Sequence, residues 1–173
     1  YLICEDCVWG FLDTSGIVIT PPRYSFVQNF VNGSAIVAKD GKWGLINKQG
    51  IEVVACQYDN VNYLENTNHQ VIKVYREKPK YGLIDTLGQL AINAVYEEIG
   101  DFKDGLLAVQ QAGLWGFVDG DGKEVIPCQY KEVQHFNEGL AAVRKDRLWG
   151  YINKSNEIII DFQYRRAGNF SNG

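Results

Sequence analysis

The sequence contains no methionine and only two histidines among its 173 residues. Because it also begins at Tyr1, we expect a fragment or a processed piece of a longer chain. The two histidines, His69 and His135, have no Cys or Ser partner in a recognisable motif. A nucleophile–base pair of the kind that hydrolases use is therefore not expected, and we predict that the chain is not an enzyme.

Long hydrophobic runs and basic blocks are also missing. Purely aliphatic runs such as Ile158–Ile160 are far shorter than the roughly 20 residues of a membrane helix. Acidic and basic residues are interspersed, and the net charge is −4. The clustered positive charge that is typical of nucleic-acid-binding proteins is therefore absent. A hydrophobic content of 46% is enough for a folded core. We expect a folded chain with no membrane span and no nucleic-acid partner.

The sequence does contain one pattern five times over, in which an aromatic residue precedes glycine at spacings of 34, 38, 34 and 34 residues. Tyrosine follows fifteen residues after the aromatic anchor in every copy. The anchors are Trp9, Trp43, Tyr81, Trp115 and Trp149, and the tyrosines are Tyr24, Tyr58, Tyr96, Tyr130 and Tyr164. Four extra residues before Tyr81 lengthen the second copy. We predict a single repeat domain over residues 1–173, in which these ten residues have structural roles.

Each copy predicts a three-stranded antiparallel meander. Asp40-Gly41 is a hairpin signal, and Asn47–Gly50 has the Asx-x-x-Gly pattern of a tight turn. A third strand follows, such as Ile51–Val54. The spacing Tyr-x-x-Val-x-x-Phe that comes next favours either one helical turn or a short fourth strand.

The anchor strand is apolar on both faces. Trp115 and Phe117 share one face, while Gly116 and Val118 share the other, because strand side chains alternate. Both faces need cover, which a stack of small sheets provides. We expect each anchor to be buried between consecutive units, removing about 150–250 Å² from water. The glycine opposite it is expected to admit a bulky ring of the neighbouring unit.

These features predict an all-β fold of five tandem repeats of about 34 residues, each a meander of three to four strands, in a five-bladed propeller-like ring. An open curved β-repeat array is the alternative. The two termini together lack one residue of a complete unit, which fits a closed ring or a piece of a longer array equally. The ring is favoured because closure would remove open sheet edges. The short unit favours the alternative, since about 40–45 residues are common in one class of propeller.

The motif Trp-Gly-x-aliphatic-[Asp/Asn]-x-x-Gly, followed by Tyr-x-x-Val-x-x-Phe-x-x-Gly-Leu-Ala-x-Val, resembles the WG-containing repeat family over essentially the whole chain. The match is clearest in the fourth copy, Leu114–Val143. The resemblance implies a mostly bacterial, non-catalytic β-repeat module, often part of a larger or exported protein, with no catalytic residues to transfer. The chain departs from the pattern at Tyr81, which replaces Trp, and at Asn156, which replaces Gly.

No metal or cofactor is expected from the remaining motifs. Cys4 and Cys7 form a single CxxC without the second pair of a zinc site, so incidental thiols or a local disulfide are favoured over a redox or metal role. Cys56 and Cys128 share a repeat column with Phe162, which indicates small buried apolar residues. The stretch that begins at Asp119 starts like a calcium loop but has Tyr130 at its twelfth position, where such a loop needs Glu.

The lengthened second copy is the candidate binding loop, because an enlarged loop on a rigid frame often holds binding residues. Its residues are Glu65, Asn66, Asn68, His69 and Gln70. Drift of a surface loop is the alternative. We predict a non-catalytic interaction or scaffold module that binds a protein partner. With 13% aromatic residues, a carbohydrate-binding propeller is the second hypothesis, and it requires exposed rings near the loops.

Overall fold

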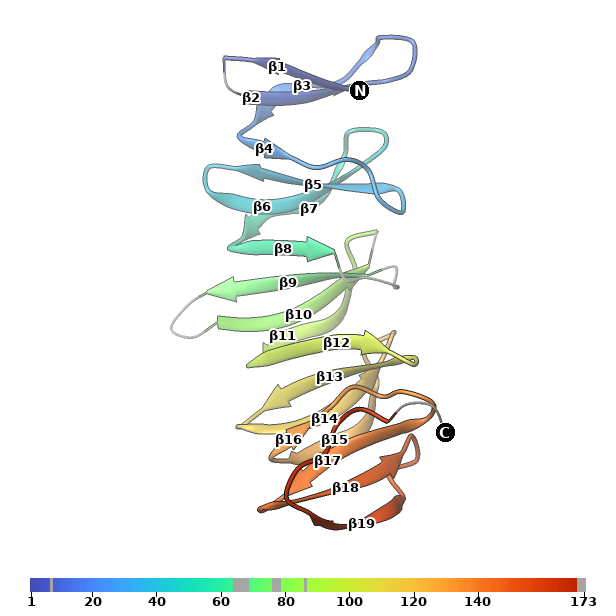
Figure 1. Cartoon of the computed structure of the whole chain (residues 1–173). Helices are drawn as coiled ribbons and strands as arrows, with labels where there is room; N and C mark the ends of the chain where they lie inside the picture. Colours follow the sequence, from blue (N-terminus) through green and yellow to red (C-terminus); the bar gives the residue numbers. More distant parts are fainter. Residues whose placement is uncertain (7, 64–68, 76–78, 86, 171–173) are drawn as a thin grey trace. The chain divides into compact units, whose positions relative to one another are not determined.

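The chain forms five small antiparallel β-sheets in a computed structural model that describes all residues except 7, 64–68, 76–78, 86 and 171–173 (Figure 1). The described part of the chain has nineteen strands and no helix, so it has no helix with the length and hydropathy to cross a membrane. The strands are β1 (Leu2–Glu5), β2 (Val8–Leu12), β3 (Val18–Tyr24), β4 (Phe26–Val27), β5 (Ser34–Lys39), β6 (Lys42–Asn47), β7 (Glu52–Tyr58), β8 (Asn60–Tyr63), β9 (His69–Tyr75), β10 (Pro79–Asp85), β11 (Leu90–Tyr96), β12 (Glu98–Lys103), β13 (Leu106–Gln111), β14 (Leu114–Asp119), β15 (Glu124–Tyr130), β16 (Glu132–Val133), β17 (Leu140–Lys145), β18 (Leu148–Asn153) and β19 (Ile158–Tyr164). The all-β class and the five tandem repeats are confirmed.

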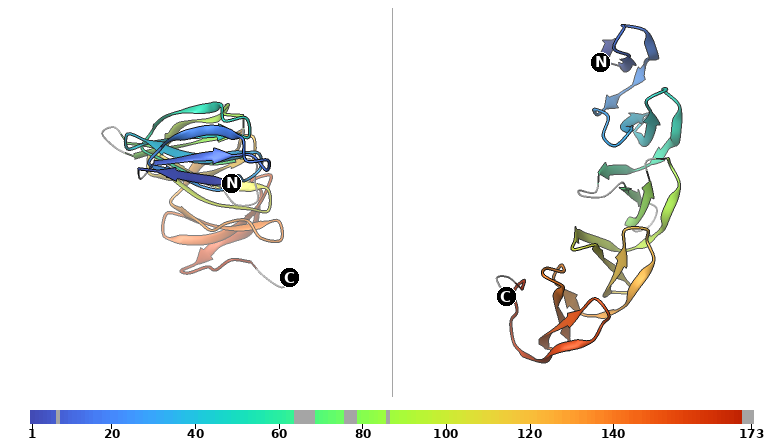
Figure 2. Two further views of the ribbon diagram at one scale, coloured as in Figure 1. Left: turned by 90° about the horizontal axis from the view of Figure 1, so that it is seen from above. Right: turned by 90° about the vertical axis from the view of Figure 1, so that its right-hand side faces the viewer.

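The sheets follow one another along the chain, and we number them one to five. Sheet one has the order β1-β2-β3, and each later sheet has four strands in sequence order, such as β4-β5-β6-β7 and β16-β17-β18-β19 (Figures 1 and 2). The segment after each of the first four repeat tyrosines therefore forms a strand and not a helical turn. It pairs with the next repeat, as Val27 does with Val37. One sequence repeat thus contributes strands to two consecutive sheets.

The predicted turns are confirmed. Asp40 and Gly41 have φ values of 52° and 73°, and this pair of positive values suits a two-residue hairpin. The side-chain oxygen of Asn47 accepts hydrogen bonds from the backbone N–H groups of Gln49 and Ile51, each at 3.0 Å. Gly50 closes this turn with a φ of 77°, a value that glycine adopts without strain.

The glycine of the Trp-Gly pair has a different role from the one predicted. A Cβ atom on Gly116 would lie 2.7 Å from the backbone nitrogen of Cys128, which belongs to the next strand of the same sheet. The register explains this approach: Trp115 pairs with Tyr130 and Phe117 with Ile126, so a step of two residues along β14 corresponds to a step of four along β15. The bulge folds β15 over the glycine. The predicted entry of a ring from a neighbouring unit is therefore wrong.

Both faces of the sheets are covered, as predicted. On β14, Phe117 is 1% exposed and Val118 is 0% exposed. Phe117 lies on what we call the front face, which packs on the back face of the following sheet. One such seam joins sheets four and five, and its buried residues include Phe117, Ile126 and Tyr130 in front and Ala141, Val143 and Ile152 behind. The seam between sheets one and two repeats the pattern, with Phe11 and Tyr24 in front and Ala35, Val37 and Ile46 behind.

The chain divides into two compact units. The first holds β1 to β10, and the second holds most of β11 and all of β12 to β19. Each unit contains a complete seam between two sheets, so the stacking is established within each of them. Closure of the five sheets into a ring, and the open array, both stay predictions.

Candidate binding surface

Two of the repeat tyrosines, Tyr24 and Tyr130, join consecutive sheets through their hydroxyl groups. Tyr24 is 0% exposed, and its hydroxyl donates a hydrogen bond to Glu52 Oε1 at 2.9 Å in the following sheet. The Arg23 guanidinium donates to the same hydroxyl at 2.8 Å and lies 3.4 Å from the Glu52 carboxylate. Burial raises the pKa of Tyr24 to about 12, because the seam disfavours a phenolate. Tyr24 is therefore a structural link between the two sheets, and it stays protonated at neutral pH.

The fifth repeat makes this link through its departure from the family pattern. Tyr130 donates to Asn156 Oδ1 at 2.7 Å, and Asn156 occupies the turn position that is glycine in the other copies. In those copies the glycine lies close to the preceding sheet: a Cβ atom on Gly122 would lie 2.7 Å from the carbonyl oxygen of Ala91. Asn tolerates the φ of 61° found there and supplies a hydrogen-bond acceptor that glycine lacks. Sequence reasoning noted the substitution without finding its reason.

The tryptophan anchors are less buried than predicted. Trp149 is 8% exposed, but Trp9 is 36% exposed, and Trp43, Tyr81 and Trp115 are half-buried. The residues two and three positions later are the buried ones, as Phe117 and Val118 show. Trp43 lies at the margin of its own sheet, where its ring is 4.9 Å from that of Phe26. The expectation that all five anchors are hidden between units is wrong.

Exposed aliphatic side chains gather beside the Asx turns of the first unit. Ile17 is 65% exposed, Ile51 is 60% exposed and Leu87 is 70% exposed, and each lies in the turn of a successive sheet. We call these three residues the turn edge. The positions that match Ile17 and Ile51 in the second unit are charged, Lys123 and Glu157. Leu87 lies directly before its turn glycine, whereas Ile17 and Ile51 follow theirs, and sequence reasoning missed the turn edge.

An open groove of about 290 Å³ runs alongside the turn edge. Its lining residues are Asn32, Gly33, Asn47, Lys48, Gln49, Val53 and Leu87. The Asn47 oxygen is occupied by the turn, whereas Lys48 and Gln49 are exposed. The groove thus combines aliphatic contact from Val53 and Leu87 with an ammonium and an amide, which can bind backbone carbonyls or carboxylates of a ligand.

The repeat motif that shapes these turns is matched by the model of the WG containing repeat. The match covers residues 9–43, 43–66, 81–115, 115–149 and 149–173, which is most of the chain. The chain belongs to the WG-containing repeat family. No curated protein matches it.

Solved structures with distantly similar folds were found for the WG sheets. A eukaryotic initiation factor shares 12% identity with a TM-score of 0.50, over 96% of this chain and 52% of that one. Hsv2 from Kluyveromyces lactis, with its loop 6CD replaced, shares 11% identity over 73% of this chain and 46% of that one, with a TM-score of 0.44. The chain thus spans about half the length of either protein. At these identities the likeness concerns the fold alone.

The lengthened WG repeat contains the five residues of the candidate binding loop. Glu65, Asn66 and Asn68 lie outside the described residues. His69 and Gln70 begin β9, where their backbones pair with Asp85 and Ile84 of β10. The hairpin of β9 and β10 extends beyond those of the other WG repeats, since Pro79 pairs with Tyr75. The role of these five residues as a binding loop stays a prediction.

The WG repeats hold their described thiols in structural settings. Cys56 and Cys128 are half-buried, and burial raises the pKa of each thiol, which disfavours the reactive thiolate. Cys128 Sγ lies 3.6 Å from the carbonyl oxygen of Val109. Cys4 is exposed and free, and Cys7 lies outside the described residues. No group of three or more His, Cys, Asp or Glu residues suited to a metal ion occurs in the described part.

Proposed function

We propose that the chain is a non-catalytic binding module whose turn edge recognises a protein partner. The observation that carries this proposal is the repetition of an exposed aliphatic side chain at the Asx turn of three successive sheets, Ile17, Ile51 and Leu87, beside a groove. Single exposed aliphatic residues are common on protein surfaces and need no explanation. A set of three at the Asx turns of successive sheets, of which Leu87 also lines the groove, supports a binding role.

The chemistry of the turn edge supports a protein over a carbohydrate. Packed sheets lie about 10 Å apart, so side chains on three successive turns span about 20 Å, which is the length of an extended segment of six residues. None of the seven residues that line the groove is aromatic, whereas stacking on sugars needs flat rings. Lys48 and Gln49 provide the polar contacts that a peptide backbone requires.

The titratable groups support a non-catalytic role. The tyrosines and cysteines with raised pKa values, such as Tyr130 and Cys128, owe them first to burial in the seams. The carboxyl groups of Asp13 and Asp104 have lowered pKa values because they accept hydrogen bonds from Ser15 and Lys154. These interactions close turns and join sheets, and none pairs a nucleophile with a base.

A matched pair of triple variants tests the binding role. Ile17→Ser, Ile51→Ser and Leu87→Ser together remove the turn edge, while Val125→Ser, Leu148→Ser and Ile158→Ser remove comparably exposed aliphatic residues of the second unit. A protein captured from lysate by the immobilised chain is purified, and its affinity is measured by calorimetry. We expect at least about tenfold weaker binding to the first variant and no change with the second.

Two results would count against the protein-binding role. If the partner bound both triple variants with equal affinity, the turn edge would not be part of the interface. Binding of the unmodified chain to members of a glycan array, with loss on the first triple variant alone, would assign the groove to a carbohydrate.

A further inference from the structure

Sheet two has an apolar row of side chains at a place where the later sheets have polar residues. In its first three strands, Phe26 pairs with Ala38, and Ala38 pairs with the anchor Trp43. Directly paired residues of neighbouring strands project from the same face, so the row is continuous. The residue pairs at the same place in sheets three, four and five are Asn60 with Lys73, Glu98 with Gln110, and Glu132 with Arg144. Among these four sheets, sheet two alone departs from the polar pattern.

The row in sheet two is partly open to solvent. Phe26 is 40% exposed, and Trp43 and its β7 partner Tyr58 are half-buried. The ring centroids of Phe26 and Trp43 lie 4.9 Å apart, and the two rings are tilted by 57°. The small Ala38 between them leaves room for this contact. We call Phe26, Ala38, Trp43 and Tyr58 the aromatic row.

The polar atoms of the aromatic row remain available to a ligand. Tyr24, at the same repeat position as Tyr58, donates its hydroxyl proton to Glu52 of the following sheet. The residue at the position of Glu52 in the next repeat is Leu90, which has no side-chain acceptor. Among the described residues, neither the Tyr58 hydroxyl nor the Trp43 indole N–H donates a hydrogen bond. Both can therefore donate to a ligand.

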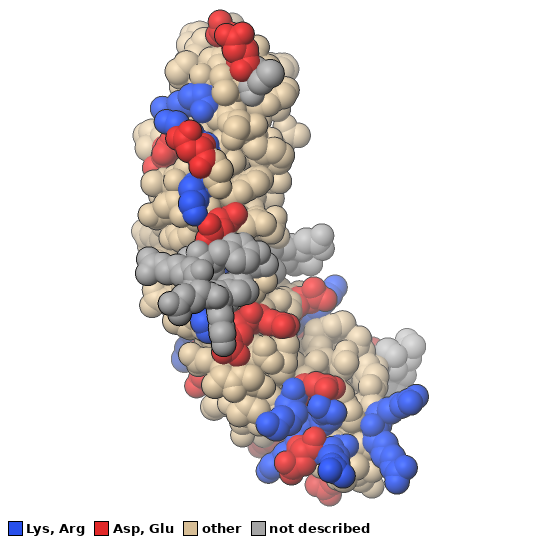
Figure 3. Space-filling view, turned by 90° about the vertical axis from the view of Figure 1, so that its left-hand side faces the viewer, with Lys and Arg blue, Asp and Glu red and all other residues tan. Residues whose placement is uncertain are grey.

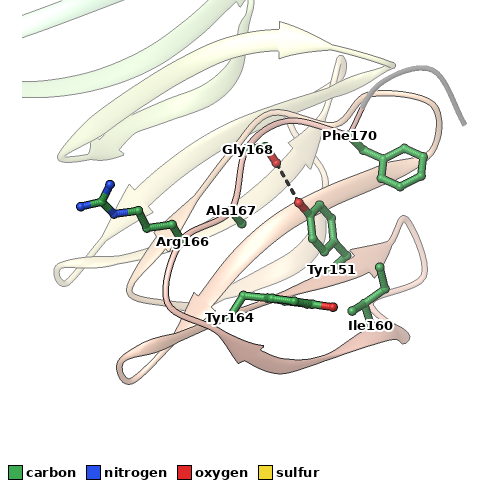
Figure 4. Close-up of a pocket in the computed structure, with 7 residues that line it drawn as sticks. All are labelled: Tyr151, Ile160, Tyr164, Arg166, Ala167, Gly168 and Phe170. Atoms are coloured by element: carbon green, nitrogen blue, oxygen red, sulfur yellow. Dashed lines mark hydrogen bonds between the residues drawn. The ribbon is translucent and has the colours of Figure 1, made fainter.

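The charge of the surroundings favours an uncharged ligand. Figure 3 views the side on which the hairpin of β5 and β6 lies, and it shows uncharged surface beside a line of acidic and basic side chains in the first unit. In the fifth repeat, Arg166 occupies the position of Phe26 and lines an open cavity of about 330 Å³. Figure 4 shows its guanidinium pointing away from the rings of Tyr151 and Tyr164. Sheet two has a neutral ring at this position instead.

We propose that the aromatic row binds a proline-rich segment of another protein in the polyproline II conformation. Proline rings pack on exposed aromatic side chains, and this helix has no internal hydrogen bonds, so its carbonyl groups can accept from Trp43 and Tyr58. The row crosses four strands that lie about 4.8 Å apart, or about 14 Å in all. That is the length of about five residues of polyproline II helix. The segment is uncharged and preformed, so its binding costs little ordering entropy.

The aromatic row favours proline over a carbohydrate, and it is separate from the turn edge. The tilted rings of Phe26 and Trp43 do not form the single flat platform on which a sugar stacks. Trp43 lies near the start of β6, whereas the turn of Asn47 that adjoins the turn edge lies at its end. A partner can therefore bind at one of these places without the other.

Nuclear magnetic resonance of the isotope-labelled chain tests this proposal, because each indole N–H gives a resonance of its own. Trp43→Phe identifies the Trp43 resonance. The probe is a blocked peptide of about ten prolines, and a blocked glycine–serine peptide of the same length is the control, since it is uncharged but flexible. We expect the proline peptide to shift the Trp43 resonance until it saturates, and the glycine–serine peptide to leave it in place.

Three variants locate the binding site. Phe26→Glu gives sheet two the residue type of Glu132, which the repeat accommodates, and should weaken peptide binding at least about tenfold. Ala38→Gln copies Gln110 and should weaken binding too, because it fills the space between the rings. Val31→Glu is the matched control: Val31 is also 40% exposed but lies outside the row, so this change should leave the affinity unaltered.

Several results would overturn the proposal. One is a Trp43 resonance that does not move with up to about 5 mM of the proline peptide. Another is equal weakening by Phe26→Glu and Val31→Glu. A shift caused by cellohexaose and not by the proline peptide would assign the row to a carbohydrate. Loss of peptide binding in the triple variant of the turn edge would place the peptide at that site instead, whereas unchanged binding would confirm that the two sites are independent.

Discussion

The Tyr130 hydroxyl donates a hydrogen bond to Asn156 Oδ1 at 2.7 Å, linking the last strand of sheet four to a turn of sheet five. Tyr24 and Glu52 make the matching link between sheets one and two at 2.9 Å. The acceptors occupy different repeat positions in the two seams, although both donors belong to the same column. In these two seams the repeat tyrosine thus links its sheet to the following one through whichever acceptor that sheet provides.

Asn156 should tolerate glycine better than alanine. Its φ of 61° suits Asn and Gly but strains alanine, and both substitutions remove the acceptor for Tyr130. We expect Asn156→Ala to lower the free energy of unfolding by about 2 kcal/mol and Asn156→Gly by about 1 kcal/mol or less. Urea denaturation measures both values. Equal losses for the two variants would show that the backbone conformation at Asn156 contributes nothing.

The glycine of the Trp-Gly pair should be far more sensitive than a hairpin glycine. Gly116→Ala should lower the free energy of unfolding by at least about 3 kcal/mol, since the new methyl would collide with the backbone of β15. Gly113→Ala is the control: its φ is 73°, but no atom lies within 4 Å of the added Cβ, so about 1 kcal/mol is expected. If Gly116→Ala cost no more than Gly113→Ala, the bulge would not enclose the glycine.

The four tryptophans should differ in their access to a fluorescence quencher. Trp9 is 36% exposed and Trp149 is 8% exposed, so acrylamide should quench the first several times more efficiently. Chains that keep one tryptophan, with the other three replaced by phenylalanine, separate the signals. Efficient quenching of Trp149 in folded protein would contradict the burial of its ring in sheet five.

Stability should fall at high pH because of Tyr24. Its pKa rises from 10.0 to about 12 on folding, so its contribution is fully present below pH 10 and is lost as the pH rises through 12. The loss attributable to this residue is roughly 2 kcal/mol. Urea midpoints compared between about pH 9 and about pH 11.5 should fall less for Tyr24→Phe than for the unmodified chain. Parallel decreases in both proteins would show that another group titrates.

The repeat columns were enough to predict the sheets and their turns. Asp40-Gly41 and Asn47–Gly50 specify backbone geometry through residues that are close in sequence, so their structures follow from local chemistry. Strand alternation could not predict why position 116 is glycine. The bulge in β15 shifts the strand register, and no local sequence signal marks the residues that form this bulge. Strand alternation also does not predict how deeply each anchor side chain is buried. Only the packed seam shows that Phe117 is less exposed than Trp115.

The binding surfaces were harder to predict than the fold. Ile17, Ile51 and Leu87 look like ordinary strand residues in the sequence, and their shared exposure emerges only when successive turns are placed side by side. Exposure depends on what covers a face, and a repeated motif does not encode that locally.

A double-mutant cycle across one seam tests most directly whether the tyrosine column holds consecutive sheets together. Tyr130→Phe, Asn156→Gly and the double variant are compared by urea denaturation with the unmodified chain. We predict a coupling energy of about 1 kcal/mol, since either single change breaks the hydrogen bond and the second change then has nothing further to remove. Effects that add within about 0.3 kcal/mol would contradict the link between sheets four and five.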